Sequence, residues 1–296
     1  ESFWAVGWIM AALLGYFLVP KQIGGWPGWR WALLVGVVPA AYALVVRHGL
    51  PESVRFLESK GRSAEAEASV REFEKHSNAE PPADFDTAVA NTPTSVEPTG
   101  QRPSIFSPGL RRRTIALWAV WFFVNLSYYG AFTWLPTLLY RAGHSLVRSF
   151  EYTLIITLAQ LPGYAMAAWL IEKWGRRPTL ATFLLGSGIA AAFFGVQTTP
   201  AGILIAGCAL SFFNLGAWGA LYAIGPEIYP TTMRGSGTGA AAAAGRVAGI
   251  IAPLIVPVLL LTGGNPLVFG VFAVSFLIAS GSALLLPERR NMDMVE

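Results

Sequence analysis

Residues 113–139 read RTIALWAVWFFVNLSYYGAFTWLPTLL, a run with no acidic residue and one basic residue, at its first position. A helix of about 20 apolar residues crosses the hydrocarbon core of a bilayer, which is roughly 30 Å thick. Backbone groups without hydrogen-bond partners are costly in lipid, and the run lacks the alternating pattern of a β-barrel strand. We therefore expect it to form a membrane-spanning helix.

The whole chain shows the same character. Of its 296 residues 54% are hydrophobic and 13% are charged, roughly half of the charged fraction of soluble domains. This composition excludes an ordinary soluble enzyme, a disordered chain and a nucleic-acid-binding domain. The expected fold class is an all-α polytopic membrane protein with eight transmembrane helices. The predicted spans are 1–20, 31–48, 113–139, 150–171, 179–197, 201–225, 237–262 and 266–286.

The basic residues are distributed unevenly over the two sides that alternating spans define. Apart from Arg246, one side has only Lys21, Arg30, Arg141 and Arg148, and all other Lys and Arg residues fall on the opposite side. By the positive-inside rule, the richer side is cytoplasmic. We expect a multi-pass protein of the cell (plasma or inner) membrane with both ends of this chain in the cytoplasm. The net charge of +4 then needs no nucleic-acid partner.

One long polar segment, 49–112, separates the spans into two groups on the cytoplasmic side. Its first half has an amphipathic helical pattern, and its second half is rich in Pro, Ala, Thr and Ser, which predicts a flexible linker. The predicted parts are therefore two helices in 1–48, this loop, a six-helix bundle in 113–286 and a cytoplasmic tail, 287–296. Six helices after a long central loop are typical of one half of a transporter.

Three motifs lie at the cytoplasmic ends of predicted spans: PESVRFL at 51–57, EKWGRR at 172–177 and PEIYPTTMRG at 226–235. In order and placement they resemble signatures of the sugar porters and the wider major facilitator superfamily. Glu172 and Val54 depart from the usual Asp and Pro. The resemblance implies that the spans are helices five to twelve of a twelve-helix fold. Residues 1–48 are then the last two helices of the N-terminal bundle, and helices one to four are expected to be missing.

The resemblance also implies a gate at the cytoplasmic face. Charges on different helices pair when this gate is shut, and a half-buried ion pair suits a switch because its gain and its desolvation cost nearly cancel. The alternative is that these charges only anchor the helix ends, which we prefer for Arg111, Arg112 and Arg113. The predicted gating residues are Glu52, Arg55, Glu172, Arg176, Arg177, Glu227 and Arg234.

Arg246 is the charged residue that lies deepest in a predicted span. It stands in GRVAGIIAP at 245–253, and an arginine near the middle of the membrane costs at least about 3 kcal/mol. It should therefore face a cavity or a partner, and its planar guanidinium fits a carboxylate. This stretch resembles the organic-anion branch of the superfamily and its bacterial niacin-transporter relatives, which implies that Arg246 meets an anionic substrate. The alternative is an internal pair with a carboxylate of another span.

Aromatic and amide side chains at helical spacing extend the candidate substrate site. Pairs four residues apart lie on one face of a helix, and Trp and Tyr rings stack on flat ligands. The alternative is that these side chains serve packing or lipid contact. The predicted substrate-binding residues, besides Arg246, are Asn125, Tyr129, Gln160, Tyr164, Asn214, Trp218 and Tyr222.

The leading hypothesis is a secondary active transporter that moves a small organic anion, an aromatic monocarboxylate such as nicotinate, by alternating access. Proton symport is implied by the resemblance alone, since no predicted span contains Asp. We expect a monomer in the lipid bilayer, without cofactor, metal site or enzymatic activity. The alternatives are a transporter of a sugar or another neutral metabolite, a membrane receptor that does not transport, and an inactive truncated product. Uptake competition by glucose, or ligand binding without transport, distinguishes them.

Overall fold

The computed structural model describes residues 2–49, 52, 54, 57, 61–77, 104–141, 143, 145–230 and 233–288. The chain divides into two compact units, residues 1–29 with 103–296 and residues 30–102. Arg55 and most of the predicted linker lie outside the described residues, so the predictions for them stay predictions.

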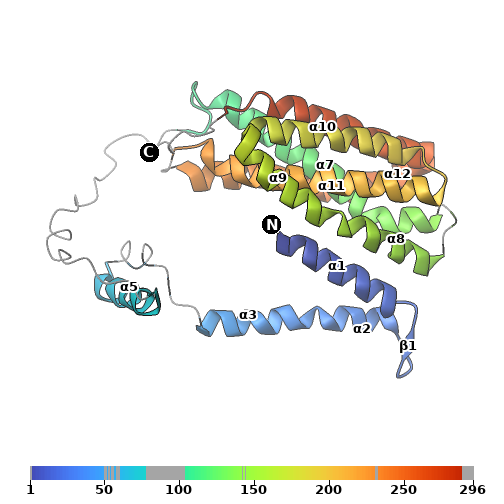
Figure 1. The fold of residues 1–296 in the computed structure, drawn as a ribbon, viewed down its shortest axis with the longest axis horizontal. Coiled ribbons are helices and arrows are strands. Elements are labelled where there is room, and N and C mark those ends of the chain that lie inside the picture. Colours follow the sequence, from blue (N-terminus) through green and yellow to red (C-terminus); the bar gives the residue numbers. More distant parts are fainter. Residues whose placement is uncertain are drawn as a thin grey trace. The chain divides into compact units, whose positions relative to one another are not determined.

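The larger unit is a bundle of long apolar helices (Figure 1). Helices α7, α10 and α11 are each long and apolar enough to cross a membrane, as is the pair α8 and α9. Helix α12 continues through a kink and contains the last two predicted spans, while α1 is a shorter apolar helix. The bounds are α1 Ser2–Phe17, α7 Arg111–Arg141, α8 Leu146–Leu158, α9 Gln160–Trp174, α10 Arg176–Gly195, α11 Pro200–Glu227 and α12 Arg234–Ala283.

The smaller unit contains most of a further apolar span and a polar helix. Helices α2, Gly28–Val35, and α3, Val37–Gly49, meet at Gly36 and together form a span of membrane length. Helix α5, Ser63–Ser77, is polar, and Arg62 forms an exposed ion pair of 2.6 Å with Glu65 in its first turn. Within the described residues, six helical segments are long and apolar enough to cross a membrane. Helix α12 contains two of the predicted spans, and α1 is a shorter apolar helix at the place of the first one. The predicted all-α polytopic membrane fold is confirmed.

Backbone irregularities mark the joints between spans. A short hairpin, β1 Gln22–Ile23 with β2 Trp26–Pro27, was not predicted, and Gly24 and Gly25 at its tip have φ of 59° and 77°. Such positive φ angles are strained for any residue with a Cβ atom, so the Gly-Gly pair permits the tight turn. Gly264, with φ 65°, bends α12 where two spans were predicted, and Ala159 divides the predicted span 150–171 into α8 and α9.

The core of the bundle combines large rings with close approaches at glycine. Phe183, Phe269 and Phe272 are among the largest fully buried side chains. A Cβ atom at Gly163 of α9 would lie 2.3 Å from the carbonyl oxygen of Phe212 in α11, so the absence of a side chain lets these backbones touch. Small residues allow this close helix packing in membranes. The approach fixes α9 beside α11, and both helices carry predicted site residues.

One end of the bundle gathers the basic helix ends. The Tyr229 hydroxyl, just after α11, donates to Thr114 Oγ1 at 3.1 Å near the start of α7, and Thr114 donates to the Ile105 carbonyl at 2.7 Å. Burial raises the pKa of Tyr229. The Tyr229 ring also fills the space beside Gly237, where a Cβ atom would lie 2.5 Å from it. The PEIYP motif therefore holds the starts of α7 and α12 against the end of α11.

Candidate functional site

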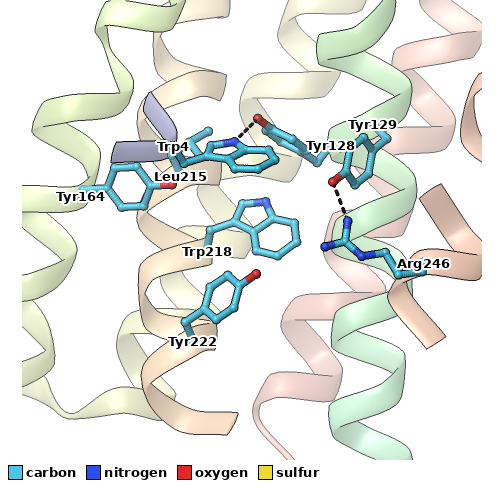
Figure 2. A pocket seen from close by; sticks show the side chains of 8 residues that line it. All are labelled: Trp4, Tyr128, Tyr129, Tyr164, Leu215, Trp218, Tyr222 and Arg246. Carbon is cyan, nitrogen blue, oxygen red and sulfur yellow. Dashed lines mark hydrogen bonds between the residues drawn. The ribbon is translucent and has the colours of Figure 1, made fainter. Parts of the chain in front are cut away.

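A cavity inside the larger unit brings together side chains from five helices (Figure 2). Its lining is aromatic except for one leucine and one arginine. The volume is about 30 Å³, which is the space of one or two water molecules. A ligand with an aromatic ring therefore requires the cavity to widen. The lining residues are Trp4, Tyr128, Tyr129, Tyr164, Leu215, Trp218, Tyr222 and Arg246.

Arg246 of α12 supplies the positive charge of this cavity. Its Nη1 donates a hydrogen bond of 2.9 Å to the hydroxyl of Tyr129 on α7 (Figure 2). Gly249 permits the contact between the two helices, because a Cβ atom there would lie only 3.3 Å from the Tyr129 ring. Among the described residues, no carboxylate lies within salt-bridge distance of Arg246. The guanidinium is held by a neutral group and keeps donors for an anion.

The aromatic wall opposite is built mainly by α11. Trp218 and Tyr222 are nearly parallel, with ring centroids 5.8 Å apart, and Trp121 of α7 packs against both at close to a right angle. Tyr164 of α9 completes this side beside Gly219. The predicted residues Tyr129, Tyr164, Trp218, Tyr222 and Arg246 therefore meet at one cavity, although they come from four helices.

Three lining residues were not predicted. Trp4 of α1 donates from Nε1 to the Tyr128 hydroxyl at 2.8 Å, a bond that links the first helix to α7 across one side of the cavity (Figure 2). Leu215 lies one turn from Trp218 on α11. The sequence signal for Tyr128 was its place beside Tyr129. For Trp4 it was an indole N–H group within an apolar run, because such a group favours a hydrogen-bond acceptor where water is excluded.

The three predicted amides do not line the cavity. Asn125 faces α12 as Tyr129 does, but it is buried one turn away and donates to the carbonyl of Trp121 at 2.7 Å. Its amide lies against Gly245, where a Cβ atom would be 2.5 Å from it. Gln160 and Asn214 are fully buried, and their amide atoms have no hydrogen-bond partner among the described residues. The spacing of Asn214 and Trp218 puts them on one face of α11, but it does not predict that the Asn214 side chain is fully buried.

The second feature is a charge cluster at the basic end of the bundle, formed by Arg176, Arg177, Glu227 and Glu288. Arg176 Nε pairs with Glu227 Oε1 at 3.2 Å between α10 and α11, and each side chain is 21% exposed. The Glu288 carboxylate accepts from the backbone N–H groups of Arg176 and Arg177 at 3.2 and 2.9 Å. Glu288 thus caps the N-terminus of α10, where the helix dipole favours an anion.

Glu288 was not predicted as a site residue. Its carboxylate fits at the start of α10 because residue 175 is a glycine. Gly175 precedes α10 with φ 98°, and a Cβ atom there would lie 2.8 Å from the Glu288 carboxylate. The glycine of the EKWGRR motif therefore leaves room for an acid from the far end of the chain. A lone Glu in a terminal segment carries no signal for this contact, because the contact forms only when α10 and α12 pack together.

The other predicted gating residues that the structure describes do not belong to the charge cluster. Glu172 is exposed in the last turn of α9 and has no ion pair within the described part of the chain. Arg234 begins α12 and is half-buried. Glu52 is exposed in the smaller unit, and Arg55 lies outside the described residues. The structure thus joins Arg176 to Glu227 directly and brings Arg177 to the cluster through its backbone.

A family model described as sugar (and other) transporter matches residues 1–288, almost the whole chain. The chain belongs to this family of the major facilitator superfamily. The niacin transporter NiaP of Acinetobacter baylyi is 46% identical over 248 residues, covering 82% of this chain and 53% of the relative. A Bacillus subtilis protein, provisionally named niacin/nicotinamide transporter NiaP, is 39% identical over 297 residues, covering 100% of this chain and 65% of the relative.

Solved structures share the fold. The proton:xylose symporter XylE bound to 6-bromo-6-deoxy-D-glucose has a TM-score of 0.72 at 21% identity, covering 98% of this chain and 63% of that one. A partially occluded inward-open form of XylE from E. coli has a TM-score of 0.68 at 20% identity. The match covers 98% of this chain and 62% of that one. The chain spans between about half and two thirds of the length of these relatives. It is a multi-pass membrane protein of a transporter family.

Proposed function

We propose that this protein is a secondary transporter of a small organic anion, an aromatic monocarboxylate such as nicotinate. The observation that carries the proposal is Arg246, a guanidinium at an aromatic cavity with a tyrosine hydroxyl as its partner and no carboxylate paired with it among the described residues. A carboxylate fits the planar fork of arginine, and the ring of such a ligand fits walls of Tyr and Trp. The niacin transporter names of the two relatives support this class of ligand.

The lining favours an anion over a neutral sugar. A sugar requires several hydrogen-bonding groups, and amides are well suited to that task. Asn125, Gln160 and Asn214 do not line the cavity, so its polar groups are tyrosine hydroxyls, indole N–H groups and one fixed positive charge. The sugar alternative therefore has less support from the described lining than the aromatic carboxylate.

Transport also requires a conformational change, and the charge cluster is the proposed gate. The Arg176–Glu227 pair is only part-buried, so opening it exposes both charges to water at a small net cost. In this proposal the cluster faces the cytoplasm, and its pair breaks when the cavity opens to that side. Proton symport and a monomeric state remain proposals from family membership. Within the described spans no Asp is available as a proton carrier.

Uptake of radiolabelled nicotinate by cells that express the full-length protein, and that lack uptake of their own, tests the function. We expect uptake above that of empty-vector cells, reduced by excess benzoate or unlabelled nicotinate and unchanged by excess glucose. A protonophore should reduce uptake if transport is coupled to protons. Competition by glucose with none by benzoate would contradict the proposal and favour the sugar alternative. Binding of nicotinate without uptake would favour a receptor.

A further inference from the structure

Trp218 presents a hydrogen-bond donor that has no acceptor among the described residues. The residue is 8% exposed and lines the cavity, and its Nε1 atom is buried without a hydrogen-bond partner. Figure 2 shows this nitrogen on the edge of the ring that points toward Trp4, which lines the same cavity. Burial of an N–H group without an acceptor is unfavourable, so this edge favours a water or a ligand atom that accepts a hydrogen bond.

The second indole of the lining is already satisfied. Trp4 Nε1 donates to the Tyr128 hydroxyl at 2.8 Å, so it has no N–H left for a ligand. Trp218 Nε1 has almost no accessible surface in this structure, so a ligand reaches its N–H group only when the cavity of about 30 Å³ widens. A ligand that enters the widened cavity with a hydrogen-bond acceptor at this edge pairs the N–H group, whereas a ligand without one leaves it unpaired.

The packing of Trp218 limits how it can meet a ligand. Tyr222 lies nearly parallel to it with centroids 5.8 Å apart, and Trp121 and Tyr128 approach at steep angles with centroids 5.6 and 5.8 Å away. Neighbouring rings therefore occupy much of the surface that a stacking ligand would need. The N–H edge is therefore the part of Trp218 that can still form a hydrogen bond with a ligand.

We propose that Trp218 Nε1 donates to the ring nitrogen of an aromatic carboxylate whose carboxylate group binds Arg246. This inference rests on the proposed function and adds the residue that selects a pyridine ring over a benzene ring. The ring nitrogen of nicotinate is unprotonated at neutral pH and accepts a hydrogen bond, whereas benzoate has a C–H group at that place. A site with a buried donor discriminates against a ligand that leaves the donor unpaired.

Competition binding on the purified full-length protein in lipid nanodiscs tests this. Labelled nicotinate is displaced by unlabelled nicotinate or by benzoate. We expect nicotinate to bind about three- to tenfold more tightly, the factor that corresponds to one neutral hydrogen bond. Trp218→Phe should bring the ratio close to one, mainly by weakening nicotinate. Both acids should still bind, because Arg246 still meets their carboxylate.

A matched control is available in the same aromatic cluster. Trp121 also has a buried Nε1 without a hydrogen-bond partner among the described residues, but it packs edge-to-face against Trp218 and is not among the residues that line the cavity. Trp121→Phe removes the same group and should keep the preference for nicotinate. If Trp218→Phe fails to fold, 3-benzothienylalanine at position 218 keeps the ring size and removes only the N–H group.

The outcomes separate this inference from the function on which it rests. Equal affinity of the unchanged protein for nicotinate and benzoate would overturn the role of Trp218 and leave the anion site standing. A preference that survives both substitutions at position 218 would do the same. If the unchanged protein binds neither acid, the proposed function and this inference both fail.

Discussion

The cavity and the charge cluster use charge in opposite ways. In the cavity, Arg246 is held by the Tyr129 hydroxyl, and no described carboxylate pairs with it. In the cluster, Arg176 pairs with Glu227, while Glu288 caps the helix on which Arg176 lies. A cation without a paired anion is available to an outside anion, whereas a paired cation joins two helices. This difference supports our proposal that the cavity binds the ligand and that the cluster controls the conformation.

Removing the Arg176–Glu227 ion pair is expected to separate the two regions most clearly, because it should reduce uptake much more than affinity. Glu227→Gln removes the negative charge between α10 and α11 and leaves the part-buried Arg176 without its ion-pair partner. Loss of such a pair costs about 1–3 kcal/mol in the state that contains it, which shifts a two-state equilibrium at least about fivefold. We expect nicotinate uptake to fall at least about fivefold, while the equilibrium affinity changes less than about twofold.

The charge-swapped double variant Arg176→Glu with Glu227→Arg is the control. It rebuilds an ion pair between the same helices and should recover part of the lost uptake. Loss of nicotinate affinity in proportion to uptake would show that the cavity and the cluster do not have separate roles.

A smaller effect is expected at Glu288. Glu288→Gln keeps the size of the side chain but weakens the cap on the N-terminus of α10, which is worth about 1 kcal/mol. We expect the apparent Tm of the purified protein to fall by a few degrees, while uptake stays within about twofold. Glu151→Gln, at an exposed carboxylate of α8, should leave Tm unchanged. An equal fall in both variants would mean that the cap does not stabilise the bundle.

Hydrophobic run length was enough to predict the eight spans, because lipid allows few alternatives to a helix. It did not place the hairpin at 22–27 or the break at Ala159, since both depend on local backbone angles within apolar sequence. The end of the bundle that gathers the basic residues also follows from sequence. The Arg176–Glu227 contact joins the second and third motifs there.

The candidate site was less predictable than the fold. Arg246, Tyr129 and Trp218 could be predicted as site residues from the sequence. A charge within a span is costly unless it faces a cavity or a partner, and aromatic residues at helical spacing share one face of a helix. Gln160 and Asn214 are neutral amides at the same helical spacing, but they are buried away from the lining, because helix rotation and packing decide which polar group reaches the cavity. Trp4 and Glu288 reach their partners across long sequence separations, which spacing cannot predict.

The most direct test of the central claim is the preference of the cavity for a carboxylate over its neutral amide. Nicotinate and nicotinamide share the ring and its nitrogen and differ in the charge that Arg246 is proposed to bind. In equilibrium binding to the full-length protein, we expect nicotinate to bind at least about tenfold more tightly. Arg246→Ala should abolish this preference by weakening nicotinate, and Arg141→Ala, at the exposed end of α7, should keep it. A preference for nicotinate that survives Arg246→Ala would contradict the account.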